Sequence, residues 1–597
     1  MKLTSLGLSG ADFDSLAAGA ARPETYRLLR NGQLTKRFLQ LRALADDTAV
    51  AHPEVRQHIA LLTAVQRTDA TAVTMVLGHP QVGAWLSHCL RRLHTTTDAD
   101  DVPLGVVVGQ IAAVAAAAAI RAGHPAEVTV PLRRGEVMLP TLGVAHLADE
   151  NAFDPATIRI EPAGTVVRMG DRTVAIPPDP SGDAPGWRGL RRLHASADGR
   201  TIVADLDDLS PHRDTLEPLA VRASTAELAR WQDLLERSWA LLVSSHPRHA
   251  GLAGESLRSL IPLADLPALA SASITSNDAF GAVFLTRPAD EEKFATTLVH
   301  ELFHSMLNAV LELIPLHRAS GNELLYSPWR DDPRPLVGIL HGAYSFMGVG
   351  DFWRRRQENG DDRESRFEFL RTRGEVEVAL HTLTQSDLLT DEGVRFVRAM
   401  SAKVASWPNP DLPDDATSAA DDVTDHWLRW RLLNLHPDAA EIDALAAAWH
   451  HADDRRLDLD AVGDTIRPVA RTQFSGERGR VRARQIQLRD PALFRRIVDG
   501  RAERPAEATP ADIAYVAGDW AVAIDRYERQ LVEHPDRAEQ WAGLALACRR
   551  NGDEDGARVL TSRPEVVRAL HRAVRSAGPV ELARWLGVRS AVRVPAR

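Results

Sequence analysis

The stretch "EEKFATTLVHELFHSMLNAVLELIP", residues 291–315, sets the interpretation of the whole chain. Acidic residues open it, apolar residues recur at helical spacing and Pro315 closes it, so the stretch predicts one long helix. His300 and His304 stand four residues apart and therefore project from the same face of that helix. Two imidazoles in this arrangement can bind one metal ion, and Glu301 completes the pattern His-Glu-x-x-His. The sequence therefore predicts a metal-binding helix.

A short strand is expected directly before this helix. The segment "SITSNDAFGAVFLT" contains a strand-like run from Ala279 to Thr286. In metallopeptidase-type folds, an edge strand beside the metal helix pairs with an extended peptide by adding a strand to the sheet. The sequence thus predicts a zincin-like metal helix with an adjacent edge strand, and a peptide as substrate.

Two residues compete as the third metal ligand. Glu323 follows His304 with eighteen residues between them, a spacing used by a large class of zinc aminopeptidases. This choice favours zinc, with Glu301 as the general base for attack of water on a peptide bond. His341 lies in "LHGAYSFMGVGDFW", beside the apolar face of a further predicted helix. The residues alone leave both ligands open.

Three linked sequence blocks resemble the HExxH-motif peptide-modification family, bacterial proteins associated with ribosomally made peptide natural products. The blocks are "LVHELFH", the loop "LYSPWRDDPRP" and the helix that begins "LHGAYSF". Members of that family are understood as iron(II)- and 2-oxoglutarate-dependent hydroxylases, which use dioxygen to act at the β-carbon of residues in a peptide. The resemblance implies that His300, His304 and His341 bind the iron. Glu301 then hydrogen-bonds a ligand or an iron-bound water in place of a base role.

A 2-oxoglutarate site also needs a cation for the distal carboxylate, and arginine fits that geometry best. Arg330 and Arg334 lie in the second block, a proline-stiffened loop between the two metal segments. Tyr326 and Tyr344 are the expected aromatic residues of the keto-acid or peptide pocket. An all-histidine ligand set departs from the two-histidine-one-carboxylate triad of non-haem iron oxygenases. Glu323 is therefore kept as an alternative ligand.

Composition narrows the classes of function. The chain has 597 residues and a net charge of −10, which provides no basic surface for nucleic acid. Cys89 and Cys548 are the only cysteines, and the N-terminus lacks a secretory pattern, so we expect a cytoplasmic protein. The uncharged run at residues 104–120 is nearly long enough to span a membrane, but its alanine content favours a buried helix.

The expected fold is mainly α-helical with a small β-rich or mixed module. We expect a helical N-terminal region at 1–123, the β-rich module at 124–220, a helical metal-binding catalytic domain at 221–460 and a C-terminal helical region at 461–597. In the last region "GDWAVA" and "GDEDGA" stand 34 residues apart, the tetratricopeptide period, so tetratricopeptide-like hairpins are predicted. The Pro- and acid-rich run at 407–422 is expected to be a surface loop or linker.

Three functions follow from these patterns. The first is iron(II)/2-oxoglutarate-dependent hydroxylation of a ribosomally made peptide. The second is a zinc metallopeptidase with Glu301 as general base. The third is a non-catalytic scaffold that binds a peptide on the edge strand or the C-terminal repeats. Neither nucleic acid nor membrane is expected as a partner.

Overall fold

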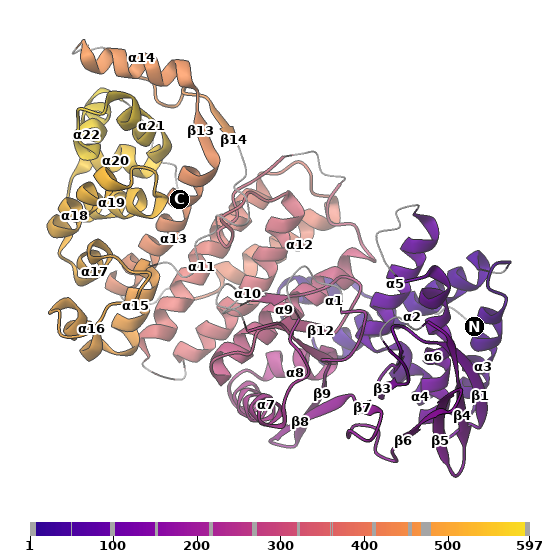
Figure 1. Ribbon diagram of the computed structural model, residues 1–597. Coiled ribbons are helices and arrows are strands. Elements are labelled where there is room, and N and C mark those ends of the chain that lie inside the picture. Colours follow the sequence, from indigo (N-terminus) through magenta and orange to yellow (C-terminus); the bar gives the residue numbers. More distant parts are fainter. Residues whose placement is uncertain are drawn as a thin grey trace. The chain divides into compact units, whose positions relative to one another are not determined.

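The computed structural model describes residues 7–48, 50–95, 102–149, 153–213, 219–265, 272–318, 323–358, 360, 362–408, 413–451, 456–466 and 479–590. In these residues the chain is mainly helical, with 22 helices and 14 strands (Figure 1). The predicted combination of a mainly α-helical fold with a β-containing part is therefore confirmed. The chain forms two compact units, Met1–Pro315 and Leu316–Arg597. The boundary falls inside the segment 221–460, and the finer domain limits stay predictions.

The first unit contains nine of the helices and twelve of the strands in the described residues. Its helices are α1 (Gly10–Ala17), α2 (Pro23–Asp47), α3 (Glu54–Thr68), α4 (Ala70–Leu77), α5 (Pro80–His94), α6 (Leu104–Arg121), α7 (Thr225–Ser245), α8 (Pro247–Ser256) and α9 (Glu291–Leu311). Its strands are β1 (Ala126–Pro131), β2 (Glu136–Leu139), β3 (Gly143–His146), β4 (Pro155–Glu161), β5 (Gly164–Met169), β6 (Arg172–Ile176), β7 (Trp187–Gly189), β8 (Arg191–Ala197), β9 (Arg200–Leu206), β10 (Ser259–Pro262), β11 (Ser273–Ile274) and β12 (Ala282–Leu285).

The apolar helix α6 lies in the core of the first unit. Its length and mean hydropathy of 1.9 would allow a membrane span, but 61% of that window is buried inside the protein. One apolar core extends from Leu41 to Trp187 and is shared by helices α2 to α6 and strands β1 to β7; within it α6 contacts α3, α4, α5, β1, β2 and β4 (Figure 1). Gln110, the polar residue within the run, donates to the carbonyl of Met138 at 3.1 Å. The buried-helix interpretation is therefore supported.

The helix with the His-Glu-x-x-His pattern packs beside a five-stranded sheet in the order β11-β12-β10-β9-β8. Strands β9, β10 and β12 run parallel to one another, and β11 runs antiparallel to β12. Strands β8 and β9 come from the predicted β-rich module and so contribute to the sheet next to α9. Asp290 caps α9 by accepting from the Lys293 amide at 2.7 Å, as the acidic start of the stretch predicts.

The second unit is helical in the residues that the structure describes, apart from a two-stranded ribbon. Its elements are α10 (Leu336–Glu358), α11 (Arg363–Thr384), α12 (Asp391–Ala405), α13 (Pro413–Asn434), β13 (Leu435–Pro437), α14 (Ala439–His450), β14 (Asp464–Ile466), α15 (Gly479–Arg489), α16 (Pro491–Val498), α17 (Pro510–Ala517), α18 (Trp520–Glu533), α19 (Ala538–Arg550), α20 (Glu554–Ser562), α21 (Pro564–Val574) and α22 (Pro579–Arg589).

Helix α13 corrects the expected loop at 407–422, because this helix begins at Pro413. Asp414 is exposed, but Asp415, Asp421, Asp422 and Asp425 are buried, and three of these four are paired with arginines from other helices. Asp421 accepts from Arg550 at 2.6 Å, and Asp425 accepts from Arg480 at 2.6 Å. Tertiary ion pairs therefore replace the solvation on which the loop expectation was based.

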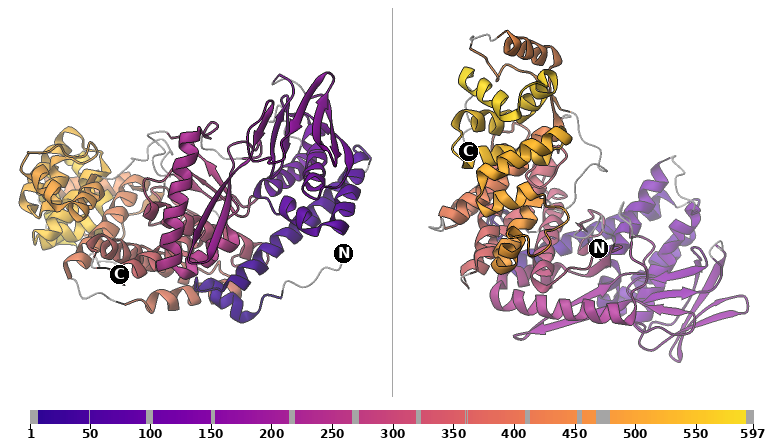
Figure 2. Two further views of the ribbon diagram at one scale, coloured as in Figure 1. Left: turned by 90° about the horizontal axis from the view of Figure 1, so that it is seen from below. Right: turned by 60° about the vertical axis from the view of Figure 1, so that its left-hand side comes forward.

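The C-terminal helices α17 to α22 pack on one another around a shared core that also includes Leu428 and Leu432 of α13 (Figure 2). Gly518 and Gly552, the glycines of the two "GD" motifs, both follow a helix and have left-handed backbone angles, with φ of +91° and +79°. Each glycine permits the sharp turn into the next helix. The 34-residue spacing thus corresponds to equivalent turns.

Asp422 of α13 generates a pH prediction. Burial raises the pKa of this carboxyl to about 7; the Arg484 charge opposes the rise and the Asp425 charge adds to it. Because the folded pKa lies above the ordinary aspartate value of 3.8, the contribution of Asp422 to stability is present at low pH and is lost as pH rises through 7. Asp422→Asn should therefore stabilise the protein relative to wild type at about pH 8, by up to about 4 kcal/mol, and much less near pH 4.

Urea unfolding at both pH values measures this difference. Asp443→Asn, at an exposed position of α14, is the matched control. A stability difference for Asp422→Asn that does not change with pH would contradict the assignment.

Candidate metal centre

The two histidines of α9 converge on one point. The Nε2 atoms of His300 and His304 lie 3.1 Å apart, and the ring planes make an angle of 86°. Two imidazoles bound to one ion through bonds of about 2.1 Å bring their nitrogens to about 3.0–3.4 Å from each other. The pair therefore fits a metal ion as a two-nitrogen donor set.

The lowered pKa values of two of the candidate histidines also favour metal binding. Burial lowers the pKa of His300 to about 4, and the Lys293 charge lowers it further. Burial also lowers the pKa of His341 to about 4, with a contribution from His317. Both imidazoles are therefore neutral at pH 7, the form that binds metal ions.

Glu301 lies beside the pair and is buried, with 2% of the residue exposed. Burial raises the pKa of its carboxyl to about 7, while hydrogen bonds from the hydroxyls of Thr275 and Ser273 act in the opposite direction. The Thr275 hydroxyl also lies 3.0 Å from the Glu301 carbonyl oxygen. The Glu301 Oε2 atom accepts from the Thr275 hydroxyl, and the Oε1 atom lies 3.9 Å from His300 Nε2. Strand β11 and the turn after it thus hold this carboxyl next to the imidazoles.

The prediction that the run from Ala279 to Thr286 forms an edge strand is wrong. Strand β12, which contains the run ending near Thr286, is paired on both sides, with β10 and with β11. Among the described residues, the outermost strand on this side of the sheet is β11, which pairs Ser273 with Leu285 and Ile274 with Phe284. A two-residue strand was missed because its polar sequence, "SITS", carries little strand pattern.

The second and third sequence blocks form one packed element in the second unit. The loop is closed by two backbone hydrogen bonds between Leu325 and Arg334, both of 2.8 Å. Trp329 stacks on Phe346 of α10 with ring centroids 4.5 Å apart, and its indole donates to Glu375 at 3.0 Å. A side chain at Gly342 would meet the Trp329 ring at 2.6 Å. The glycine of the His-Gly-x-Tyr block therefore makes room for the tryptophan of the loop.

The candidate 2-oxoglutarate residues lie on the same loop and helix. Arg330 Nε donates to Asp332 Oδ1 at 3.0 Å, and Arg334 Nε lies 3.0 Å from Oδ2 of that aspartate. Both guanidiniums are partly exposed and share a single carboxylate, which leaves further N–H groups for a ligand.

The two candidate tyrosines have partners in the second unit. The Tyr326 hydroxyl lies 2.9 Å from His426 Nδ1, and its ring contacts Trp427 and Trp430 of α13. Tyr344 is buried, 2% exposed, against Phe396 of α12. These contacts show how the tyrosines fix the loop and α10; their roles toward a cofactor stay predictions.

The predicted ligands are divided between the two units. His300 and His304 lie in the first unit, and His341 lies half-buried in the second. Glu323, the alternative ligand, is exposed in the second unit. Within the residues that the structure describes, no group of three or more His, Cys, Asp or Glu residues is arranged to hold a metal ion. The identity of the third ligand therefore stays a prediction.

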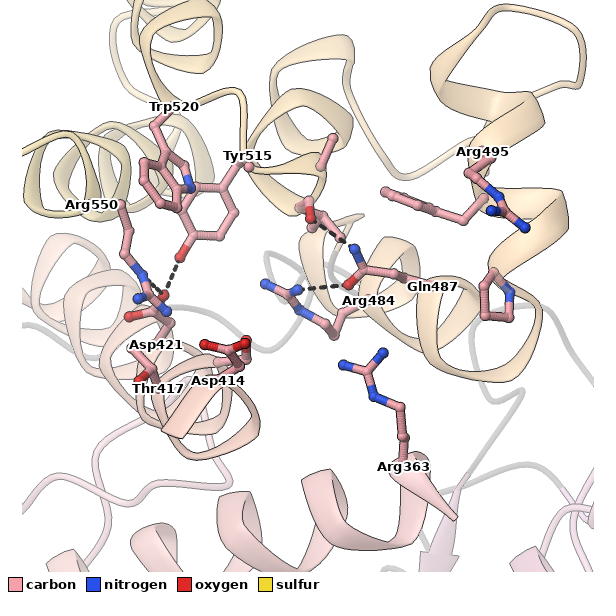
Figure 3. A pocket seen from close by; sticks show the side chains of 16 residues that line it. Arg363, Asp414, Thr417, Asp421, Arg484, Gln487, Arg495, Tyr515, Trp520 and Arg550 are labelled. Atoms are coloured by element: carbon pink, nitrogen blue, oxygen red, sulfur yellow. Dashed lines mark hydrogen bonds and ion pairs between the residues drawn. The ribbon is translucent and has the colours of Figure 1, made fainter. Parts of the chain in front are cut away.

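A pocket of about 520 Å³ lies among the C-terminal helices of the second unit (Figure 3). Asp421 on one wall accepts from the Tyr515 hydroxyl at 2.5 Å and from Arg550. Arg363 and Arg495 also line this pocket. The C-terminal region thus contributes to a polar pocket, and its predicted role in peptide binding stays a prediction.

Comparison with known proteins gave no match: no family model matches the chain, and neither does any curated protein. The family resemblance therefore rests on the three sequence blocks.

The contact between Gly342 and Trp329 can be tested by Gly342→Ala. The added methyl group would collide with the Trp329 ring, so we expect a loss of about 1–3 kcal/mol in stability, although alanine is the better helix former. Gly105→Ala on α6 is the control, because its nearest contact is an ordinary 3.5 Å to His52. Thermal melting of both variants measures the effect; equal melting temperatures would refute the packing argument.

Proposed function

We propose that this protein is an iron(II)/2-oxoglutarate-dependent dioxygenase that hydroxylates the β-carbon of a residue in a ribosomally made peptide. The observation that carries the proposal is the convergence of His300 and His304 at 3.1 Å beside the buried Glu301. The resemblance of the three sequence blocks directs this pair toward iron and oxygen chemistry. Bound iron(II) would supply activation of dioxygen, with 2-oxoglutarate as the co-substrate.

In this proposal the chain's residues have separate roles. His300, His304 and His341 hold the metal as neutral imidazoles, in agreement with the lowered pKa of His300 and His341. Arg330 or Arg334 binds the distal carboxylate of 2-oxoglutarate, because each retains N–H donors beyond its contact with Asp332. Tyr326 and Tyr344 keep the loop and α10 in place for these contacts.

Glu301 is a positioning residue in the hydroxylase. Its carboxyl accepts hydrogen bonds from the hydroxyls of Thr275 and Ser273 on the sheet side of α9. A carboxyl held in this way is better suited to orient His300 than to accept a proton from a reacting water. One observation favours the second candidate, a zinc metallopeptidase. A carboxyl with a pKa of about 7 is suited to act as a general base at neutral pH.

Several finer features belong to the same proposal. An antiparallel outer strand beside the metal helix is compatible with a zincin-like arrangement, and the C-terminal helices with tetratricopeptide-like hairpins. The peptide would approach along β11 or in the C-terminal pocket of Figure 3. Cys89 and Cys548 are buried free thiols, compatible with a cytoplasmic location.

Mass spectrometry of the short peptide encoded beside the protein tests the proposal. The peptide is incubated with the protein, iron(II), 2-oxoglutarate and air. Gain of one oxygen on an uncut chain, dependent on 2-oxoglutarate, is the expected result. Cleavage that persists with zinc and without the keto acid would establish the peptidase.

The ligand assignment predicts the effect of four substitutions. His300→Ala, His304→Ala and His341→Ala should each reduce oxygen addition to background and lower the amount of iron bound per chain. Glu323→Ala should leave both quantities nearly unchanged, because that side chain is exposed. Iron analysis of the purified variants and peptide mass spectrometry provide the two measurements. Retained activity in His341→Ala, with loss in Glu323→Ala, would reverse the choice of third ligand.

Glu301→Gln separates the two candidate reactions. The amide can still accept from Thr275, so a hydroxylase should lose only about 10- to 100-fold in rate. A peptidase would lose all cleavage, because glutamine cannot accept the proton of the attacking water. Single-turnover rates of the variant and of wild type decide between these outcomes.

A further inference from the structure

A second pocket, of about 670 Å³, lies in the first unit and does not include His300, Glu301 or His304 among its lining residues. Four arginines line it: Arg30 and Arg37 from α2, Arg192 from β8, and Arg258 from the segment before β10. The single acidic residue in the lining is Asp205. The walls therefore carry an excess of positive charge in a volume typical of ligand sites.

Arg37 is the most informative of these residues. Only 3% of it is exposed, and among the described residues none of its N–H groups has a hydrogen-bond or ion-pair partner. The acids nearest to its charge are Glu312 and Asp278. Glu312 already accepts from Gln33 at 2.8 Å, and Asp278 accepts from Arg91 at 2.7 Å. A buried guanidinium without a direct counter-charge is costly, so this position calls for an anion from outside the chain.

The other three arginines are only partly neutralised. Arg192 donates to Asp205 at 3.1 Å, and Arg30 contacts Glu255 at 3.3 Å. Arg258 donates to the backbone carbonyls of Leu257 and Glu255, which carry no full charge. Four guanidiniums thus share two carboxylates directly, and each arginine has five N–H donors.

The pocket wall also contains a strained residue. Thr141 has a φ of +70°, in the left-handed region that β-branched residues rarely adopt. Arg121 holds it there through hydrogen bonds of 2.6 Å to its hydroxyl and its carbonyl. Strain of this kind is concentrated at ligand sites, where the surrounding structure maintains it.

Apolar side chains lie beside the arginines. Met75 and Val203 line the pocket and are 45% and 40% exposed, which is unusual for large apolar residues. Leu34 and Phe280 line the same space. A ligand that matches this surface carries negative charges and an apolar group together, and it is larger than a simple inorganic anion.

We propose that this pocket binds an acidic segment of the peptide substrate, with its carboxylates on Arg37, Arg192 and Arg258 and an apolar side chain against Met75 and Val203. The inference rests on the proposed function in one respect, that the substrate is a peptide. It assigns recognition of the peptide to a pocket that shares no residue with the His300–His304 pair.

Fluorescence anisotropy with the full-length protein tests the site without iron or 2-oxoglutarate. The probe is a fluorescein-labelled peptide of alternating Glu and Leu, and the reference probe alternates Gln and Leu. The acidic probe should bind at least about tenfold more tightly than the reference, and added salt should weaken its binding. Equal affinity for the two probes would overturn the proposal.

Matched arginine variants locate the binding. Arg192→Gln should weaken the acidic probe about tenfold or more, and Arg37→Gln should do the same if it folds. Arg42→Gln is the control, because Arg42 lies on the same helix α2, is exposed and does not line the pocket. An equal effect of Arg192→Gln and Arg42→Gln would refute the site.

Competition separates carboxylate from phosphate recognition. Glutarate should displace the acidic probe at lower concentration than inorganic phosphate does. The reverse order would assign the pocket to a phosphorylated ligand and overturn the peptide proposal. Because binding is measured without turnover, a peptide that binds but gains no oxygen would contradict the proposed reaction alone.

Discussion

The buried carboxyl of Glu301 imposes the constraint on which the candidate centre depends. A carboxyl that is removed from water needs hydrogen-bond partners within the protein, and the hydroxyls of Thr275 and Ser273 provide them. These hydrogen bonds join α9 to the segment that contains β11 and hold Glu301 next to the imidazoles. The helical repeat places His300 and His304 on one face of α9, with their Nε2 atoms 3.1 Å apart. The candidate histidine pair therefore lies beside the link between the helix and the sheet.

In the second unit the packing of the helices depends on buried ion pairs along α13. Asp421 and Asp425 stand four residues apart on this helix, and each meets arginines from helices that lie far away in sequence. Arg480 also donates to Asp512 at 2.7 Å, so one guanidinium connects three helices. Removing one partner of a buried ion pair costs more stability than the intact pair adds, because a buried charge is left without a partner. The network therefore favours the one arrangement of helices in which every pair is formed.

The first unit combines two features that would serve the proposed peptide hydroxylation. The histidine pair offers two converging nitrogen donors for a metal ion, while the arginine pocket offers positive charge and an apolar rim. These surfaces have opposite electrostatic requirements, because metal ligands must be deprotonated whereas an anion site needs charged guanidiniums. The histidine pair shares no residue with the lining of the arginine pocket, so both conditions can hold at the same pH.

The sequence by itself determined the helical character of the chain, the burial of α6 and the i, i+4 histidine pair, because these depend on local periodicity. It also contained the 34-residue spacing of Gly518 and Gly552, and the structure adds that both glycines occupy left-handed turns. Only the tertiary structure decided that β12 is paired on both sides, that Thr275 holds Glu301, and that the acidic run of α13 is a buried helix. It also brought Arg37, Arg192 and Arg258 around one pocket. Strand order, ion pairing and the burial of charge depend on residues distant in sequence. Local sequence patterns do not predict such long-range contacts.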